Sequence, residues 1–107
     1  MTPYKDRFAI QADFCKAMAH PVRLEIIDRL KRRPHQVHEL STAIGVGQAN
    51  LSQHLAVLRA RGVVRARRQG VGVVYSLANP KIVEACSLIR EILVENLDQQ
   101  VAVVVPP

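Results

Sequence analysis

The stretch at residues 48–64, QANLSQHLAVLRARGVV, decides the fold. Its leucines, Leu51, Leu55 and Leu58, recur at i, i+4 and i+7, which is the spacing of one buried face of an α-helix. Gly62 follows the last leucine and predicts where the helix ends. The remaining positions are rich in amide, hydroxyl, imidazole and guanidinium groups, which form hydrogen bonds. The stretch therefore predicts a helix that presents polar groups to a partner.

A shorter helix is predicted just before it, at residues 37–44, with Leu40, Ala43 and Ile44 on its inner face. Gly45 and Gly47 then bracket a single valine. Two helices joined by such a three-residue turn have the spacing of a helix-turn-helix, which we place at about residues 37–61.

The chain before this unit predicts two more helices. The first has one apolar stripe, and the second begins at Pro21, which suits a first helical position, and ends before Pro34. The stripe of the first helix is Phe8, Ala12, Cys15 and Ala19, and that of the second is Val22, Ile26, Ile27 and Leu30.

The chain after the unit predicts a hairpin and a last helix. Two β-prone runs separated by Gly70, Val71 and Gly72 place the hairpin at about residues 64–77. Asn79 and Pro80 start the last helix, at about residues 80–97. Its apolar stripe is Ile82, Cys86, Ile89, Leu93 and Leu97.

This order of elements predicts a mainly α fold with a β-hairpin. The expected architecture is a winged helix-turn-helix of about five helices plus a two-stranded wing, in one DNA-binding and dimerisation domain spanning residues 1–107. The stripe of the last helix is longer than so small a core can cover, and a short chain gains stability by burying a further face in a partner. We therefore predict a homodimer.

The charges are separated along the chain. There are 15 Lys and Arg residues against 9 Asp and Glu residues, a net charge of +6, and none of the carboxylates falls within residues 40–83. The cations in this window are Arg59, Arg61, Arg65, Arg67, Arg68 and Lys81. Such a window favours a polyanionic partner, above all double-stranded DNA. A basic surface that is only solvated is the alternative.

Three segments, AMAHPVRLEIIDRL, ELSTAIGVGQANLSQHLAVLRARGVV and RRQGVGVVYSL, resemble the ArsR/SmtB family of bacterial metal- and stress-responsive repressors. The family pattern S-x-H-L-x-x-L-R-x-x-G-L-V is matched from Ser52 to Val64, with valine in place of its leucine. The resemblance implies a homodimeric winged-helix repressor that binds operator DNA and is released by an inducer.

The resemblance also implies DNA contacts. On the helix these are Gln48, Ala49, Asn50, Ser52, Gln53 and His54, and the arginines that would meet phosphate are Arg59, Arg65, Arg67 and Arg68. Two positions depart from the family. Gly47 replaces the serine or threonine that usually caps this helix, and Val71 and Gly72 occupy a wing tip that is commonly basic.

The usual metal sites of the family lack their ligands. The Cys-x-Cys motif aligns with Gln36, Val37 and His38, and no histidine follows His54. We interpret His35 and His38 as surface histidines, because a zinc site needs four ligands. No metal and no cofactor is therefore predicted, and His20 is interpreted as part of a helix start.

The two cysteines leave three interpretations open. Cys15 and Cys86 lie on the stripes of the first and last helices, which the resemblance places together at the dimer interface. They are small buried hydrophobes, or a redox-sensing thiol pair whose disulfide or polysulfide bridge shifts the helices, or part of an arsenite site, which favours three thiolates.

Other classes of protein fit less well. An enzyme is not predicted, because no Ser/His/Asp set, paired carboxylates or phosphate-binding loop occurs at usable spacing. A winged-helix protein-interaction module without a sensing site remains the alternative. No leader or membrane anchor is evident, so a cytoplasmic protein is expected. The apolar tail at residues 101–107 is too short to span a membrane and is expected to be disordered or to dock on a neighbour.

Overall fold

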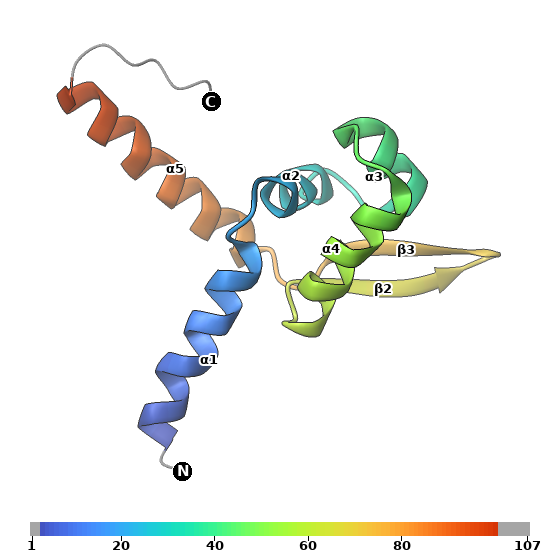
Figure 1. Ribbon diagram of the computed structural model, residues 1–107, viewed down its shortest axis with the longest axis horizontal. Helices are drawn as coiled ribbons and strands as arrows, with labels where there is room; N and C mark the ends of the chain where they lie inside the picture. The colour runs from blue at the N-terminus through green and yellow to red at the C-terminus, as the bar shows by residue number, and fades with distance from the viewer. Residues whose placement is uncertain (1–2, 101–107) are drawn as a thin grey trace.

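Five helices and three strands form the part of the chain that the structure, a computed structural model, describes, residues 3–100. In chain order they are α1 (Pro3–Met18), α2 (Pro21–Leu30), β1 (His35–Gln36), α3 (Val37–Ile44), α4 (Gln48–Ala60), β2 (Val64–Gln69), β3 (Gly72–Leu77) and α5 (Lys81–Gln100). The arrangement is a winged helix-turn-helix, as the sequence predicts (Figure 1). The predicted tail, residues 101–107, lies outside the described residues.

The core lies where α2, α3 and α4 meet the base of the hairpin. Leu51, Leu55 and Leu58 of α4 are all 0% exposed, which confirms the predicted inner face of this helix. They pack with buried aliphatic side chains of the neighbouring elements: Ile26, Ile27 and Leu30 of α2, Leu40 of α3, Val63 and Val64, and Ile82 of α5. Burial of this cluster fixes α4 against the wing and leaves its opposite face in solvent.

Local hydrogen bonds set the ends of the helices at the predicted positions. Before α2, the Nδ1 atom of His20 accepts a hydrogen bond from the Val22 N–H at 3.1 Å, and before α5 the Asn79 side chain accepts one from the Lys81 N–H at 2.9 Å. Between α3 and α4, Gly45 has φ +81°, a left-handed conformation that glycine adopts without strain. This turn sets the angle between the two helices.

The sheet has one more strand than the sequence predicts. Its order is β1-β3-β2, with both pairings antiparallel, and β1 contributes only His35 and Gln36. A two-residue strand is too short to show alternation, which is why the pattern missed it. In the hairpin, Gln69 pairs with Gly72, so the loop itself is Gly70 and Val71.

The predicted burial of Ala43 and the predicted exposure of His35 are wrong. Ala43 is exposed, because Val37, Leu40 and Ile44 form the inner face of α3, and Ala43 lies about 90° from its centre at 100° per residue. His35 is not a surface residue. It is 8% exposed, and its Nδ1 lies 2.8 Å from the carbonyl oxygen of Arg33, a hydrogen bond that satisfies the ring.

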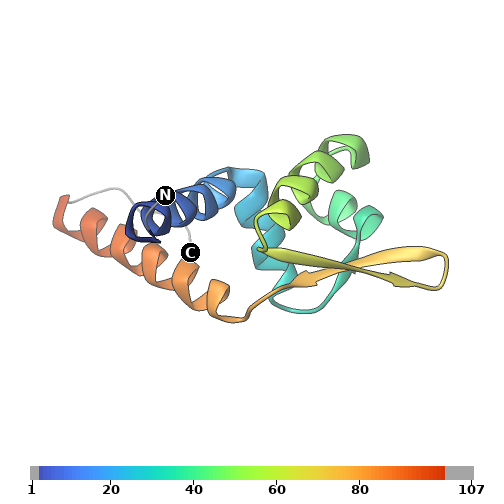
Figure 2. The ribbon, with the colours of Figure 1, turned by 90° about the horizontal axis from the view of Figure 1, so that it is seen from below.

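The first and last helices extend away from the core. Figure 1 shows α1 and α5 leaving it on the side opposite the hairpin tip and diverging, and Figure 2 shows the hairpin pointing the other way. The predicted stripe of α1 is exposed, with Phe8 at 63%, and the side chains of α1 that face the core are instead Phe14, Ala17 and Met18. Among residues 81–99 of α5, only Ile82 is buried. Within residues 3–100, no helix has the length and apolar character needed to cross a membrane.

Candidate nucleic-acid interface

The outer face of α4 carries small alanine side chains and one larger polar side chain. At 100° per residue, Ala49, Gln53, Ala56 and Ala60 lie opposite the buried leucines, and all are exposed. Alanines let a helix approach another surface closely, and Gln53 places an amide at the centre of the face. A glutamine amide can pair with the N6 and N7 atoms of adenine in the major groove.

The flanks of α4 carry the other predicted contact residues. Ser52 and Arg59 lie on one flank and Asn50 and Arg61 on the other, and all four are exposed. Gln48 is the first residue of the helix, after Gly47, whose backbone precedes the helix without any side-chain cap. The first-turn N–H groups of α4 are consequently available to an anion such as a phosphate.

His54 lies on a flank of α4 and is held by α2. The Nε atom of Arg23 donates a hydrogen bond to His54 Nδ1 at 3.1 Å, and Arg23 Nη1 donates another to the carbonyl oxygen of Ala17 at 3.1 Å. The ring centroids of His54 and His20 are 4.5 Å apart. This network joins α1, α2 and α4, so His54 has a structural role in addition to the contact that the resemblance implies.

The contact also determines the protonation of His54. A guanidinium only donates hydrogen bonds, so Nδ1 must be an acceptor, and the neutral ring carries its proton on Nε2. Partial burial lowers the pKa of His54, and the neighbouring His20 and Arg23 lower it further. The ring is therefore neutral at neutral pH, with only its Nε2–H left to donate.

The arginines of β2 are exposed beside this helix. Arg65 and Arg67 alternate with the half-buried Ala66, so they lie on the strand face away from the core, and Arg68 follows near the end of the strand. Glu39 and Glu84 are the carboxylates that flank residues 40–83 in the sequence. Glu39 accepts hydrogen bonds from the Gln36 N–H at 2.9 Å and from Arg33 at 3.0 Å. These bonds lower the pKa of Glu39 and pair its charge. The arginines meet no competing carboxylate from residues 40–83, because that stretch contains none.

The tip of the wing is apolar. Val71 is fully exposed there, at 106% of its reference area, with glycine on each side. No cation is present at the tip to meet phosphate, which agrees with the departure noted in the sequence. The basic surface of the wing lies along β2 instead.

The candidate sensing residues are separate from this surface. Cys15 and Cys86 are both free; Cys15 is exposed on α1, and Cys86 is half-buried on α5. Burial raises the pKa of the Cys86 thiol. Among residues 3–100, no three His, Cys, Asp or Glu side chains form a group that could hold a metal ion.

Arg23 is a residue of this site that the sequence analysis missed. It follows the helix start by two positions, and no spacing rule relates it to His54, which is 31 residues away along the chain. The only available signal was the presence of a cation after Pro21 and of a histidine on α4. Only the packing of α2 against α4 brings the two together.

The comparisons with known proteins agree with this geometry. Residues 20–66 match the family described as bacterial regulatory protein, arsR family. An HTH-type transcriptional regulator of Mycobacterium tuberculosis, Rv0081, is 43% identical over 97 residues, which are 90% of this chain and 85% of that protein. The transcriptional repressor PagR of Bacillus anthracis is 35% identical over 82 residues, 76% of this chain and 82% of the relative.

Solved structures show the same fold. The crystal structure of Rv0081 superposes with a TM-score of 0.82 at 40% identity, covering 95% of this chain and all (100%) of that one. The homodimeric winged helix-turn-helix DNA-binding domain Mb0332 of Mycobacterium bovis, solved by NMR, gives a TM-score of 0.82 at 28% identity and covers 91% and 90% of the two chains. The protein belongs to the arsR family of bacterial regulatory proteins and is a winged-helix DNA-binding transcriptional regulator.

Proposed function

We propose that this protein is a repressor that binds its operator as a homodimer, with α4 in the major groove and β2 along the phosphate backbone. The observation that supports this most directly is the surface of α4 and β2. It combines exposed amides and arginines in a stretch of 44 residues, 40–83, without a carboxylate. The relative PagR is a transcriptional repressor, and we infer repression by this chain from that similarity.

The exposed arms support a dimer. Large apolar side chains of α1 and α5 that the core does not cover are Phe8 and Ile10, and Leu88, Ile89, Ile92 and Leu93, each more than half exposed at 53–67%. Apolar patches of this kind are sites of association. Two copies joined through these arms would present two α4 helices, as two-fold operators require.

The base-reading face is tested with Gln53→Ala on an operator selected from a random duplex library. Loss of the amide should reduce affinity by about 1–3 kcal/mol and relax the preference at one base pair of each half-site. Unchanged affinity and base preference would show that Gln53 does not contact a base.

The phosphate-contacting strand is tested with Arg67→Ala. This variant should weaken binding to all sequences alike and reduce the steepness of the salt dependence. The charge-matched control is Arg7→Ala, because Arg7 belongs to α1, which Figure 1 shows extending away from the hairpin. Its guanidinium is 4.8 Å from the ring of Phe8, a residue of the arms, so sedimentation first has to show that the variant has the same oligomeric state as the wild type. Equal effects of the two variants would assign the salt dependence to net charge alone.

We also propose a thiol pair formed by Cys15 and Cys86 as a candidate for the switch that releases the repressor from DNA. The exposed Cys15 supports it as the attacking thiol, whereas Cys86 has a raised pKa and would react slowly as the nucleophile. Oxidant or polysulfide should lower operator affinity, and Cys15→Ser and Cys86→Ser should each abolish the response. A single variant that responds like the wild type would exclude the pair.

A further inference from the structure

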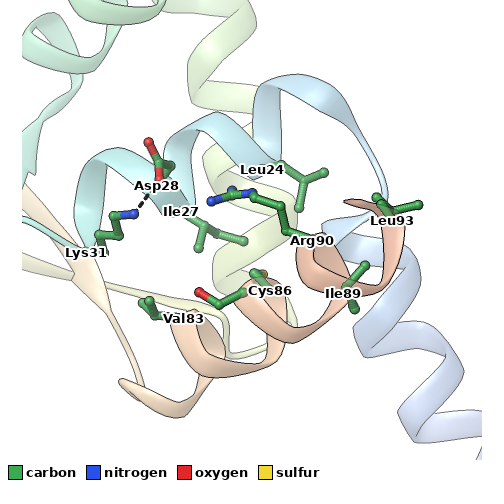
Figure 3. A pocket seen from close by; sticks show the side chains of 10 residues that line it. Leu24, Ile27, Asp28, Lys31, Val83, Cys86, Ile89, Arg90 and Leu93 are labelled. Atoms are coloured by element: carbon green, nitrogen blue, oxygen red, sulfur yellow. Dashed lines mark ion pairs between the residues drawn. The ribbon is translucent and has the colours of Figure 1, made fainter. Parts of the chain in front are cut away.

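A pocket lies between α2 and α5, away from the DNA-binding surface. Its volume is about 140 Å³, and Figure 3 shows the side chains that surround it. The lining residues from α2 are Leu24, Ile27, Asp28 and Lys31, and those from α5 are Val83, Cys86, Ser87, Ile89, Arg90 and Leu93. Ile89 and Leu93 also belong to the exposed arms, whereas the other lining residues are used neither by the arms nor by the DNA contacts.

The body of the pocket is apolar and has the size of a small ring. Five of the ten lining side chains are aliphatic and come from both helices, and Ile27 and Cys86 lie on opposite sides of the pocket (Figure 3). A dry protein cavity of about 150 Å³ with this kind of lining holds a benzene molecule. The available space therefore suits one aromatic ring or a short branched aliphatic group.

The pocket is lined by one acidic and two basic side chains, Asp28, Lys31 and Arg90. Asp28 and Lys31 form an ion pair at 2.9 Å, which lowers the pKa of Asp28, and the charge of Arg90 lowers it further. Figure 3 shows the Arg90 guanidinium extending from α5 toward α2 across the pocket. Within residues 3–100, no hydrogen bond or ion pair of Arg90 is formed, so the pocket has a net charge of about +1.

The thiol in the pocket favours binding without a covalent bond. Burial raises the pKa of Cys86, and Arg90 only partly offsets this effect. At neutral pH the group is a protonated thiol, which behaves as a small hydrophobic side chain and is a poor nucleophile. Cys86 thus contributes apolar surface to the pocket.

We propose that this pocket binds a small organic monoanion, an aromatic or branched aliphatic carboxylate, with its apolar body between Ile27 and Cys86 and its carboxylate on Arg90. A guanidinium binds a carboxylate through two parallel hydrogen bonds, which gives Arg90 a suitable ligand. We assign the pocket as the effector site of the proposed repressor, because α2 also holds α4 through the Arg23–His54 hydrogen bond. This assignment rests on the proposed function.

Binding is tested on the DNA-free protein with benzoate as the probe. Titration followed by methyl NMR should give saturable shifts at Ile27 and Leu93. Benzamide, which has the same ring without the charge, should bind at least about tenfold more weakly, because it cannot form the charged pair with Arg90. Absence of saturable shifts, or equal affinity for benzoate and benzamide, would overturn the proposal.

Two variants test whether the carboxylate of benzoate binds to Arg90. Arg90→Gln should reduce benzoate affinity about tenfold and leave benzamide affinity unchanged, and the matched Arg68→Gln on β2 should change neither. Since Arg90 is exposed, the substitution should not affect folding. Equal benzoate affinity in wild type and Arg90→Gln would overturn the assignment of Arg90.

Two further measurements distinguish ligand binding in the pocket from contact with a second copy and from the proposed repressor function. If the ring of Phe8 from a second copy contacts the Ile27 methyls in a mixed-label dimer, the partner fills the pocket and the ligand proposal is wrong. Benzoate should also change operator affinity in the wild type and not in Arg90→Gln. Binding without that change would overturn the effector assignment and leave operator binding by the repressor intact.

Discussion

The guanidinium of Arg23 donates hydrogen bonds from two different nitrogens, one to His54 on α4 and one to the Ala17 carbonyl oxygen on α1. Because arginine stays protonated throughout the stable pH range of proteins, His54 has to remain neutral at Nδ1 to accept one of these bonds. A proton on that atom would remove the acceptor and bring two positive charges into contact, with the His20 ring close by. Protonation of His54 Nδ1 would therefore break the hydrogen bond between α2 and α4.

Stability should fall as the pH is lowered through the titration of His54. Its pKa is lowered in the folded chain, chiefly by burial, whereas the unfolded chain binds the proton near its usual pKa of about 6.5. The stabilisation from the neutral ring is thus complete above about pH 6.5 and is lost as the pH falls through the lowered folded-state pKa. Urea unfolding between pH 7.5 and pH 5, roughly spanning this window, measures the loss.

The His54→Asn variant isolates this effect, since an asparagine carbonyl can accept from Arg23 and does not titrate in this range. The variant should lose less stability than the wild type on acidification. His38→Asn, at an exposed histidine of α3, should behave like the wild type. Parallel losses in the wild type and His54→Asn would assign the pH dependence to other groups.

Among the elements, α4 combines the proposed DNA-contact surface with the largest number of fully buried leucines. Replacing Leu55, which is 0% exposed, with alanine should lower the free energy of unfolding by about 2–5 kcal/mol, because it leaves a cavity in the core. Val57→Ala on the same helix, at 37% exposure, should cost less than about 1 kcal/mol. Equal losses from the two variants would contradict the assignment of the buried face.

The predictable part of the fold follows from local patterns. The leucine spacing of α4, the glycines of the turn and the hairpin, and the caps before α2 and α5 are fixed by interactions within a few residues, so the sequence predicts them. β1 pairs with a strand 38 residues or more away and has only two residues, His35↔Tyr75 and Gln36↔Val74, so no local pattern precedes it.

The candidate site was predictable to a similar extent. Exposure of Gln53 and of the β2 arginines follows from helix and strand periodicity. The restraint of His54 by Arg23 and the pocket at Arg90 depend on how α2 packs against α4 and α5. Such contacts arise from tertiary packing and leave no periodic signal in either helix.

The whole molecule is expected to depend on a second copy for part of its stability. Ile92 on α5 is 54% exposed beside Leu88 and Ile89, and a charge there should prevent association of the arms. Ile92→Glu should sediment as a monomer, and its melting temperature should no longer depend on protein concentration.

The matched control is Val94→Glu, which makes the same change about 160° around α5. This variant should remain dimeric. A monomeric wild type at micromolar concentration, or a dimeric Ile92→Glu, would contradict the arm-mediated dimer. A dimer also predicts an inverted-repeat operator whose half-sites lie about 34 Å apart, or a multiple of that distance.

The order of the sheet has a further consequence for how the protein behaves at high concentration. β2 lies at one edge of the sheet, where backbone groups are open to pairing with a strand of another molecule. Its sequence, VRARRQ, places repelling charges along that edge. Arg65→Ser should therefore raise light scattering on concentration relative to Arg7→Ser, which removes the same charge, because the residues proposed to contact phosphate also protect the free protein from strand-to-strand aggregation.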